Sequence, residues 1–161
     1  MESLERKERL PAILQRASGS DIESLLEIDK SVAGSPTYSM NNEEDWKAEL
    51  ESGVVYLIKS GGDVAGLISY EEKSPEHIYI SSLAVNPKFQ GKGLARDALM
   101  QILDQHPEVE RFDLTVHPDG PALPLYLSLG FREESREENY FGDGEPRLIL
   151  ALVRGRHSNA G

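Results

Sequence analysis

The hydrophobic and polar positions of the chain follow two periods, and the period changes several times along its length. Short runs rich in β-branched and aromatic residues predict strands, whereas apolar residues three and four positions apart predict amphipathic helices. Helices are expected from residue 20 to a loop at 31–42, at 42–50, at 91–105 and over about nine residues before 130. Strands are expected at 12–17, 54–58, 64–70, 77–85, 111–117, 131–141 and 147–153. This order, β-α-α-β-β-β-α-β-α-β-β, predicts an α/β fold with a mixed sheet and helices on both faces.

Several element boundaries carry their own signals. Ser20 followed by Glu23 has the form of a capping box at the start of the first helix. Asn42 can cap the second helix. The Ser-Gly-Gly-Asp sequence at 60–63 predicts a tight hairpin between two strands. The strand at 111–117 follows a helix, so it is expected to lie parallel to the strand before that helix.

Length and composition bound the class of protein. A chain of 161 residues with 39% apolar and 28% charged residues is typical of one globular domain over 1–161, with a loose lead-in at 1–10 and a flexible tail at 155–161. The absence of cysteine excludes disulfides, thiolate nucleophiles and thiolate metal sites, and no metal is expected. No apolar run approaches the about 18–20 residues that span a bilayer, and the N-terminus is charged. We therefore expect no membrane partner and a cytoplasmic location.

The charge is strongly negative but unevenly distributed. The formal net charge is −11, which argues against a nucleic-acid partner and leaves room for a cationic acceptor such as an amine. Residues 86–96 nevertheless contain Lys88, Lys92 and Arg96 and no acid. Lysines can simply keep an exposed turn soluble, but a polyanionic ligand would also explain a basic island in an acidic chain.

The basic island coincides with a predicted strand, a glycine turn and a helix start. Such a junction gathers main-chain N–H groups at the positive end of a helix dipole, which is a geometry that binds phosphate. It does not match a P-loop, because Lys92 is not followed by Ser or Thr. It does not match a dinucleotide fingerprint either, because the glycine pattern is not completed after Gly93. An ordinary tight turn at Gly91 and Gly93 remains the alternative.

Two segments resemble motifs of a known family. Residues 90–95, Gln-Gly-Lys-Gly-Leu-Ala, match the pattern Q/R-x-x-G-x-G/A, and residues 79–85 resemble the strand that precedes it. Residues 122–131 resemble a second motif, A-x-x-L-Y followed by L-G-F. Both motifs are those of the Gcn5-related N-acetyltransferase (GNAT) superfamily. The predicted element order also resembles that of the superfamily over roughly 12–153. The resemblance implies a mixed, mostly antiparallel sheet of about seven strands, splayed between strands 4 and 5, with about four helices on both faces.

The resemblance also implies acetyl-CoA as the cofactor. The N–H groups of 91–95 would cradle its pyrophosphate near Lys92 and Arg96. The pantetheine would run between the two splayed strands and bond the main chain of Leu83 and Val85, and donors aimed at the thioester carbonyl would stabilise an oxyanion by roughly 3–4 kcal/mol each. The expected CoA-binding residues are Leu83, Ala84, Val85, Gln90, Gly91, Lys92, Gly93, Leu94, Ala95 and Arg96.

Tyr126 is the acid that the resemblance implies. Its position matches a tyrosine that protonates the departing thiolate, and a tyrosine pKa of about 10 keeps such an acid protonated at neutral pH. From the residues alone, Tyr126 is equally an apolar position of its helix.

The general base is less clear. Thr115 and Ser81 stand where relatives carry ionisable side chains. His117, two residues beyond Thr115 on the same side of the strand, could accept a proton, or it could be a solvent-facing turn residue. Tyr79 matches a tyrosine that some protein N-terminal acetyltransferases use. A water chain without a dedicated base is also adequate.

The acceptor is expected to be a primary amine that attacks directly in a ternary complex. Residues 139–144 resemble an Asn-Tyr-Tyr turn of the ribosomal-protein-alanine and related N-terminal acetyltransferases, which favours a protein or peptide amine. The substrate-binding candidates are Tyr38, Ser81 and Tyr140.

Two alternatives to a peptide acceptor remain, and the oligomeric state is open. One is a small polyamine-like acceptor held by acids such as Glu71, Glu72 and Glu76. The other is a CoA-binding regulatory module without turnover. A monomer or a homodimer is expected.

Overall fold

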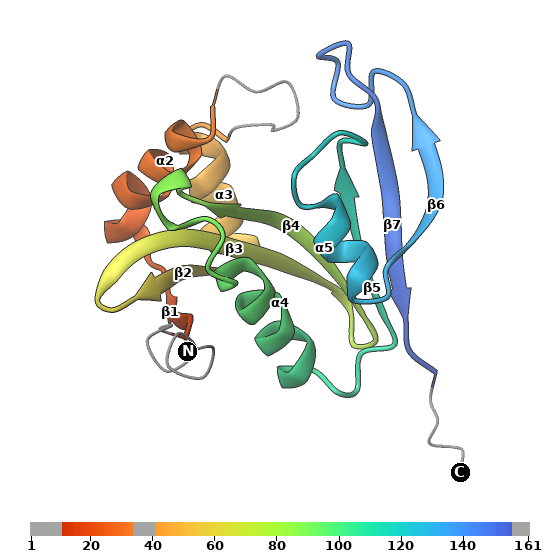
Figure 1. Cartoon of the computed structure of the whole chain (residues 1–161), viewed down its shortest axis with the longest axis horizontal. Coiled ribbons are helices and arrows are strands. Elements are labelled where there is room, and N and C mark those ends of the chain that lie inside the picture. Colours follow the sequence, from red (N-terminus) through yellow and green to blue (C-terminus); the bar gives the residue numbers. More distant parts are fainter. Residues whose placement is uncertain (1–10, 34–40, 156–161) are drawn as a thin grey trace, which may run out of the picture.

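The computed structural model describes residues 11–33 and 41–155 of the chain. Its centre is one mixed sheet of seven strands in the order β1-β2-β3-β4-β5-β7-β6 (Figure 1). The predicted order of strands and helices is confirmed over this part of the chain. The strands are β1 (Ile13–Arg16), β2 (Val54–Ser60), β3 (Asp63–Ser74), β4 (His77–Val85), β5 (Arg111–Val116), β6 (Arg132–Glu137) and β7 (Arg147–Val153).

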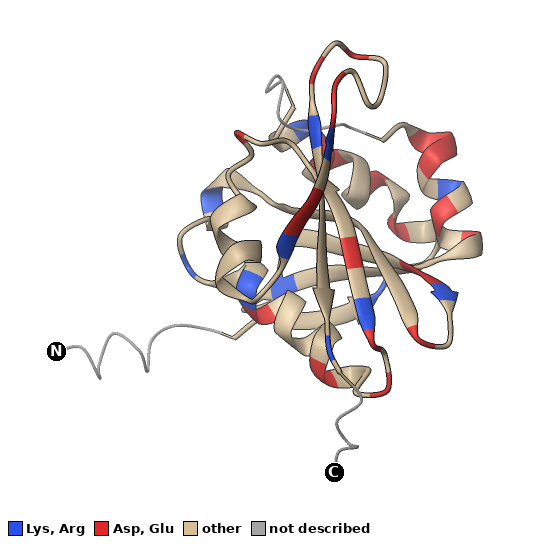
Figure 2. Ribbon diagram, turned by 90° about the vertical axis from the view of Figure 1, so that its right-hand side faces the viewer, with Lys and Arg blue, Asp and Glu red and all other residues tan. Residues whose placement is uncertain are grey.

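Helices cover both faces of the sheet, as Figure 2 shows from the side of β6 and β7. The described residues form four α-helices and two 3-10 turns. The first two α-helices pack on a cluster that includes Leu25, Trp46 and Leu67, whereas α4 and α5 pack on the cluster of the opposite face. None of these helices is long and apolar enough to cross a membrane. The elements are η1 (Gly19–Asp21), α2 (Ile22–Ser31), α3 (Glu43–Ser52), η2 (Pro87–Phe89), α4 (Leu94–Gln105) and α5 (Leu123–Ser128).

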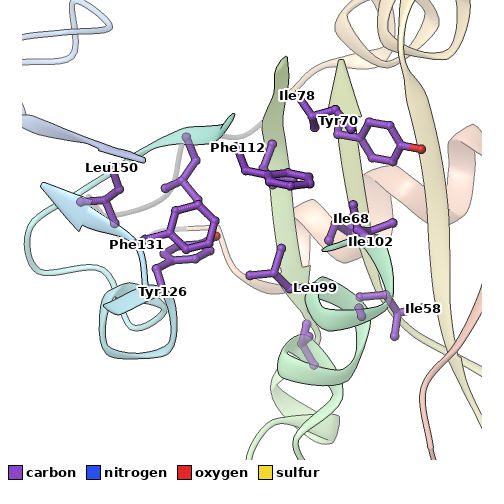
Figure 3. Close-up of a cluster of buried hydrophobic side chains, with 14 of the residues drawn as sticks. Ile58, Ile68, Tyr70, Ile78, Leu99, Ile102, Phe112, Tyr126, Phe131 and Leu150 are labelled. Carbon is purple, nitrogen blue, oxygen red and sulfur yellow. The ribbon is translucent and has the colours of Figure 1, made fainter. Parts of the chain in front are cut away.

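The larger hydrophobic cluster joins the two halves of the sheet beneath α4 and α5. Figure 3 shows Phe112 between the side chains of α4 and β3 on one side and the pair Tyr126 and Phe131 on the other. Phe131 and Ile102 have no exposed surface. Fully burying a side chain of this size contributes about 1.5–3 kcal/mol, so this cluster fixes the position of α5 and of Tyr126 relative to β4.

The sheet is split between β4 and β5. These two strands are parallel, as predicted, and pair only from His77–Ile80 to Arg111–Leu114. β4 continues to Val85, and Figure 1 shows it diverging from β5 beyond the paired part. The expected splay is therefore confirmed, and the site described below lies at this split.

The start of α2 differs from the prediction. The capping box is made by Ser18 and Asp21, not by Ser20 and Glu23: the Ser18 N–H donates to Asp21 Oδ2 at 2.9 Å. The chain enters the helix through the 3-10 turn η1, which moves the cap two residues towards the N-terminus. The cap of α3 is as predicted, because Asn42 Oδ1 accepts from the Asp45 N–H at 2.8 Å.

Besides differences of one residue at the ends of β1 and β5, three other elements are shorter than predicted. α4 begins at Leu94 rather than near 91, because Gly91 and Gly93 both have φ of 80°, outside the helical region. α5 covers six residues rather than about nine. It begins at Leu123, so that Pro124 lies in the first turn, where its missing N–H costs nothing. β6 ends at Glu137 rather than at 141.

A buried carboxylate ties α2 to α3. Asp29 has no exposed surface, and its Oδ2 accepts from Trp46 Nε1 at 2.8 Å and from the Asn41 N–H at 3.3 Å. Trp46 is itself fully buried. The carboxylate therefore links α2 to the main anchor of α3.

Asp29→Ala is expected to lower the free energy of unfolding by about 2–4 kcal/mol, because it leaves buried donors without an acceptor. Asp29→Asn keeps an acceptor oxygen for Trp46, and we expect its loss of stability to be less than half of that of Asp29→Ala. Urea unfolding of both variants measures the difference. Equal midpoints for the Ala variant and the parent protein would show that the link contributes nothing.

Candidate active site

A cavity of about 720 Å³ opens where β4 and β5 separate. Its walls come from the unpaired end of β4, the end of β5, the loop before α4, and α5. Of the residues expected to act in chemistry or binding, it brings together Tyr79, Ser81, Leu83, Ala84, Val85, Gln90, Gly91, Ala95, His117 and Tyr126. Lys92, Gly93, Leu94, Arg96 and Tyr140 do not line it, and Tyr38 lies outside the described residues.

The unpaired end of β4 turns main-chain groups into this cavity. The Asn86 N–H donates to the Ala65 carbonyl of β3 at 2.8 Å. Since main-chain groups alternate sides along a strand, those of Val85 and Leu83 point away from β3, towards the missing partner. The Val85 carbonyl accepts from Gln90 Nε2 at 2.9 Å, which fits this orientation. The edge can therefore bond an extended ligand that carries amide groups.

The loop before α4 forms a cradle of main-chain N–H groups. Gly93 caps the helix with a left-handed backbone, and Gly91 has the same φ. A Cβ at Gly91 would meet no atom within 4 Å, so the backbone conformation, not crowding, requires glycine there. The first-turn N–H groups that follow have no acceptor within the helix. Leu94 is 2% exposed, so only its main chain can reach a ligand.

Two basic side chains lie beside this cradle. Arg96 Nη1 donates to Ser128 Oγ of α5 at 3.0 Å, and the Lys92 ammonium lies 5.5 Å from the centre of the Phe89 ring. Both partners are neutral, so neither positive charge is cancelled by them. Cations and helix N–H groups together suit an anionic ligand.

Tyr126 presents a protonated hydroxyl to the cavity. The side chain is 6% exposed, and its ring packs edge to face on Phe131 at 5.7 Å. Among the described residues none exchanges a hydrogen bond with its hydroxyl, and no fully buried side-chain oxygen lacks a partner, so this hydroxyl lies at the cavity surface. Burial raises the pKa of Tyr126 above its ordinary value, which keeps it a proton donor.

His117 is buried rather than solvent-facing, with 4% of its surface exposed. Its Nδ1 accepts from the Asp119 N–H at 2.9 Å, so the proton of the neutral ring is on Nε2, which lies 2.7 Å from Glu145 Oε1. Both ring nitrogens are thus engaged. To accept a proton from a substrate, the ring would first have to give up one of these bonds.

The neighbouring face of β4 carries a chain of polar side chains. The Tyr79 hydroxyl donates to Thr115 Oγ1 at 3.0 Å, and burial raises the pKa of Tyr79. Two positions further on, the Ser81 hydroxyl donates to the Glu49 carboxylate of α3, and Ser69 Oγ lies 2.9 Å from Ser81 Oγ. No local pattern in the sequence singled out Glu49, because it lies 32 positions before Ser81.

Glu49 is the most perturbed carboxyl of this face. Burial and the nearby Glu71 carboxylate raise the pKa of Glu49 to about 7. The pKa of Glu71 is lowered by its contacts with Glu49 and with Lys73, whose ammonium lies 2.7 Å from Glu71 Oε1. Figure 2 shows how densely α3 carries acidic positions. Among the described residues, no three His, Cys, Asp or Glu side chains are grouped to hold a metal ion.

An aromatic pair stands at the tip of the hairpin between β6 and β7. Tyr140 and Phe141 pack edge to face at 4.8 Å and are 40% and 52% exposed. Phe141, not Tyr140, lines the cavity, and the Arg147 guanidinium lies 5.1 Å from the centre of its ring. The tip lies at the end where β4 and β5 diverge (Figure 1).

Sequence comparison identifies similar proteins. A model of the acetyltransferase (GNAT) family matches residues 20–131. L-2,4-diaminobutyric acid acetyltransferase of Vibrio parahaemolyticus is 36% identical over 70 residues, which cover 41% of this chain and 39% of that protein. The match therefore spans well under half of the length of this curated relative.

Several solved structures share the fold. The ribosomal-protein-S18-alanine N-acetyltransferase of Escherichia coli matches with a TM-score of 0.77 and 21% identity, over 88% of this chain and 93% of that chain. A putative phosphinothricin N-acetyltransferase matches with a TM-score of 0.75 and 21% identity, over 89% of this chain and 99% of that chain. A GNAT acetyltransferase of Elizabethkingia anophelis with acetyl-CoA bound matches with a TM-score of 0.67 and 18% identity, over 88% of this chain and 97% of that chain. At these identities the likeness establishes the architecture of the sheet and helices.

Proposed function

The chain belongs to the acetyltransferase (GNAT) family, and we propose that it transfers an acetyl group from acetyl-CoA to a primary amine while both are bound. The observation that carries this proposal is the cavity at the split of the sheet. Its space of about 720 Å³ is lined by the free strand edge and the Tyr126 side chain, and it reaches the main-chain cradle at Gly91 and Ala95.

The residues present fit acetyl-CoA. The turn through Gly91 and Gly93 offers N–H groups to a diphosphate, with Lys92 and Arg96 alongside. The main chain of Leu83 and Val85 offers hydrogen bonds to the amides of pantetheine. When bound, acetyl-CoA supplies an acetyl thioester, whose carbonyl carbon is open to attack by an amine.

The chain's own groups then stabilise the negative charge that develops on the carbonyl oxygen and supply a proton to the departing sulfur. A main-chain N–H on the β4 edge, held rigidly by pairing with β3, donates to an oxygen on which negative charge develops. A well-placed donor of this kind contributes about 3–4 kcal/mol. Tyr126 holds the proton that the departing sulfur needs, and burial prevents the early loss of that proton.

The first candidate acceptor is a protein or peptide amine. The exposed aromatic pair Tyr140 and Phe141 stands at the mouth of the cavity and offers apolar surface to an extended chain. The fold likeness to the ribosomal-protein-S18-alanine N-acetyltransferase of Escherichia coli agrees with this choice.

The second candidate acceptor is a small amine that carries another positive charge. The carboxyl groups of Glu49 and Glu71 lie on the same face as Ser81 and would favour a cation there. The curated relative, a diaminobutyric acid acetyltransferase, also acts on a small molecule with two amino groups.

Thiol release from acetyl-CoA tests the proposed function. We expect the purified protein to bind CoA by calorimetry, and to release thiol above the acceptor-free background with members of a panel of peptides, diamines and diamino acids. Saturable release with peptides alone selects the first acceptor, and release with diamines alone selects the second. CoA binding without release on any acceptor would instead identify a non-catalytic CoA-binding module.

A further inference from the structure

We propose that Glu49, acting through the hydroxyl of Ser81, takes up the proton that the acceptor amine loses. This inference rests on the proposed acetyl transfer and names the residue that serves its acceptor side. The sequence analysis did not identify Glu49 as a candidate base.

The position of Ser81 supports the proposal. Ile80 is the last residue of β4 that pairs with β5, so Ser81 is the first residue beyond the split. Ser81 lines the cavity, and its hydroxyl donates to Glu49 Oε2. Glu49 itself lies behind Ser81 in α3 and does not line the cavity. A proton from the cavity can therefore reach Glu49 only through an intermediate group, and the Ser81 hydroxyl is in contact with Glu49.

The surroundings hold the Glu49 carboxyl against Ser81. A Cβ at Gly53 would lie 3.1 Å from Glu49 Oε2 and 2.8 Å from the Tyr70 carbonyl, so glycine leaves the room that the carboxyl occupies. On the other side Ser69 Oγ, 2.9 Å away, fixes the Ser81 hydroxyl. The hydrogen bonds of Ser81 to Glu49 and to Ser69, together with the backbone close to the carboxyl at Gly53, thus restrict the Glu49–Ser81 pair to one arrangement.

The charges around Glu49 favour proton uptake near neutral pH. Glu71 of β3 is the anion that faces it, and Lys73 of the same strand is paired with Glu71. Partial burial, and after it the contact with the Glu71 carboxylate, raise the pKa of Glu49 to about 7. A base with a pKa near the working pH is the most effective one.

The other candidate bases, His117 and Tyr79, are engaged in hydrogen bonds within the protein. His117 uses both ring nitrogens within the protein. The Tyr79 hydroxyl donates to Thr115, and the pKa of Tyr79 is raised, so it stays protonated. Asp119 lines the cavity and Glu145 contacts His117, but both lie beyond the end of β5, whereas Glu49 contacts the cavity-lining hydroxyl of Ser81 on the β4 edge.

The proton balance closes with these groups. A primary ammonium loses two protons as it becomes an amide. For the first, Ser81 Oγ accepts a proton from nitrogen while its own proton passes to Glu49 Oε2, and the serine is unchanged. Tyr126 donates a proton to the departing sulfur, and the second nitrogen proton restores Tyr126. Glu49, which is only partly buried, then releases its proton to solvent, so each turnover yields one proton, one amide and one thiol.

The test compares kcat/KM of the full chain with that of Glu49→Gln across about pH 5.5 to 8.5, with the best acceptor of the panel. Taking the ratio of the two cancels the titration of the acceptor amine. We expect a ratio of about 10²-fold at pH 8 that falls towards unity below about pH 6, where Glu49 is protonated in the parent protein too. Ser81→Ala should show the same trend, while Glu51→Gln, an exposed control on the same helix, should match the parent protein.

Two results would overturn the inference, and they are distinguishable from failure of the proposed function. A ratio that stays constant with pH, or equal activities, would assign Glu49 a purely structural role. CoA affinity and melting temperature, measured in parallel, should be unchanged in Glu49→Gln; a loss of both would point to the same structural role. If the parent protein releases no thiol with any acceptor, the proposed function fails, and the inference fails with it.

Discussion

Tyr126→Phe is expected to lower kcat about 10²–10³-fold while the dissociation constant for CoA stays within about twofold. The substitution removes only a hydroxyl, and the ring keeps its contact with Phe131. That hydroxyl makes no hydrogen bond with any other described residue, so its loss leaves no partner unsatisfied. Stopped-flow measurement of thiol release gives kcat, and calorimetry gives the affinity.

Tyr70→Phe is the matched control for this prediction. Tyr70 is also a buried tyrosine of the larger cluster, but its hydroxyl bonds His106 Nε2 at 3.0 Å, away from the cavity. We expect that control to cost about 1 kcal/mol of stability and to leave kcat unchanged. Equal kcat for Tyr126→Phe and the parent protein would remove Tyr126 from the reaction.

The raised pKa of Tyr126 has a consequence for the pH profile. An acid must be protonated to act, and burial keeps this tyrosine protonated beyond the usual tyrosine range. The proton uptake that we propose for Glu49 requires its ionised form, and burial and the nearby Glu71 carboxylate raise the pKa of Glu49 to about 7. Activity should therefore rise through neutral pH and show no decline from Tyr126 up to about pH 10.

The elements of the fold were predictable because their causes are local. Period-2 and period-3.6 patterns fixed the strand and helix order, and the crossover through α4 fixed β5 as parallel to β4. The helix boundaries that were predicted wrongly depend on backbone geometry. The start of α4 follows from two left-handed glycines, and the cap of α2 moved because a 3-10 turn precedes it.

The side chains that we propose to serve the acceptor were not predictable in the same way, because their contacts join residues far apart in the sequence. Glu49 meets Ser81 across 32 positions, and His117 meets Glu145 across 28. Neither pair has a spacing that a single sequence reveals. The turn and the strand edge that we propose to bind CoA could be singled out from the sequence, since both lie within one continuous stretch that ends in the N-terminus of α4.

Gly66→Ala is expected to lower the free energy of unfolding by about 3 kcal/mol, which corresponds to a fall in Tm of about 6–12 °C. Gly66 of β3 pairs with Val85 of β4. A Cβ there would lie 2.3 Å from the Ala84 carbonyl oxygen and 3.1 Å from Val85 Cα. Both are main-chain atoms, so the clash can be relieved only by moving β4 away from β3.

This strain acts on the edge that is expected to hold the cofactor, so Gly66→Ala should also weaken CoA binding, by about tenfold or more. Gly19→Ala is the matched control, because a Cβ at Gly19 would meet no atom within 4 Å. Its Tm should stay within about 2 °C of the parent value. Differential scanning calorimetry with and without CoA measures both effects. If Gly66→Ala lowers Tm but leaves CoA affinity intact, the expected link between strain at Gly66 and the free edge of β4 is wrong.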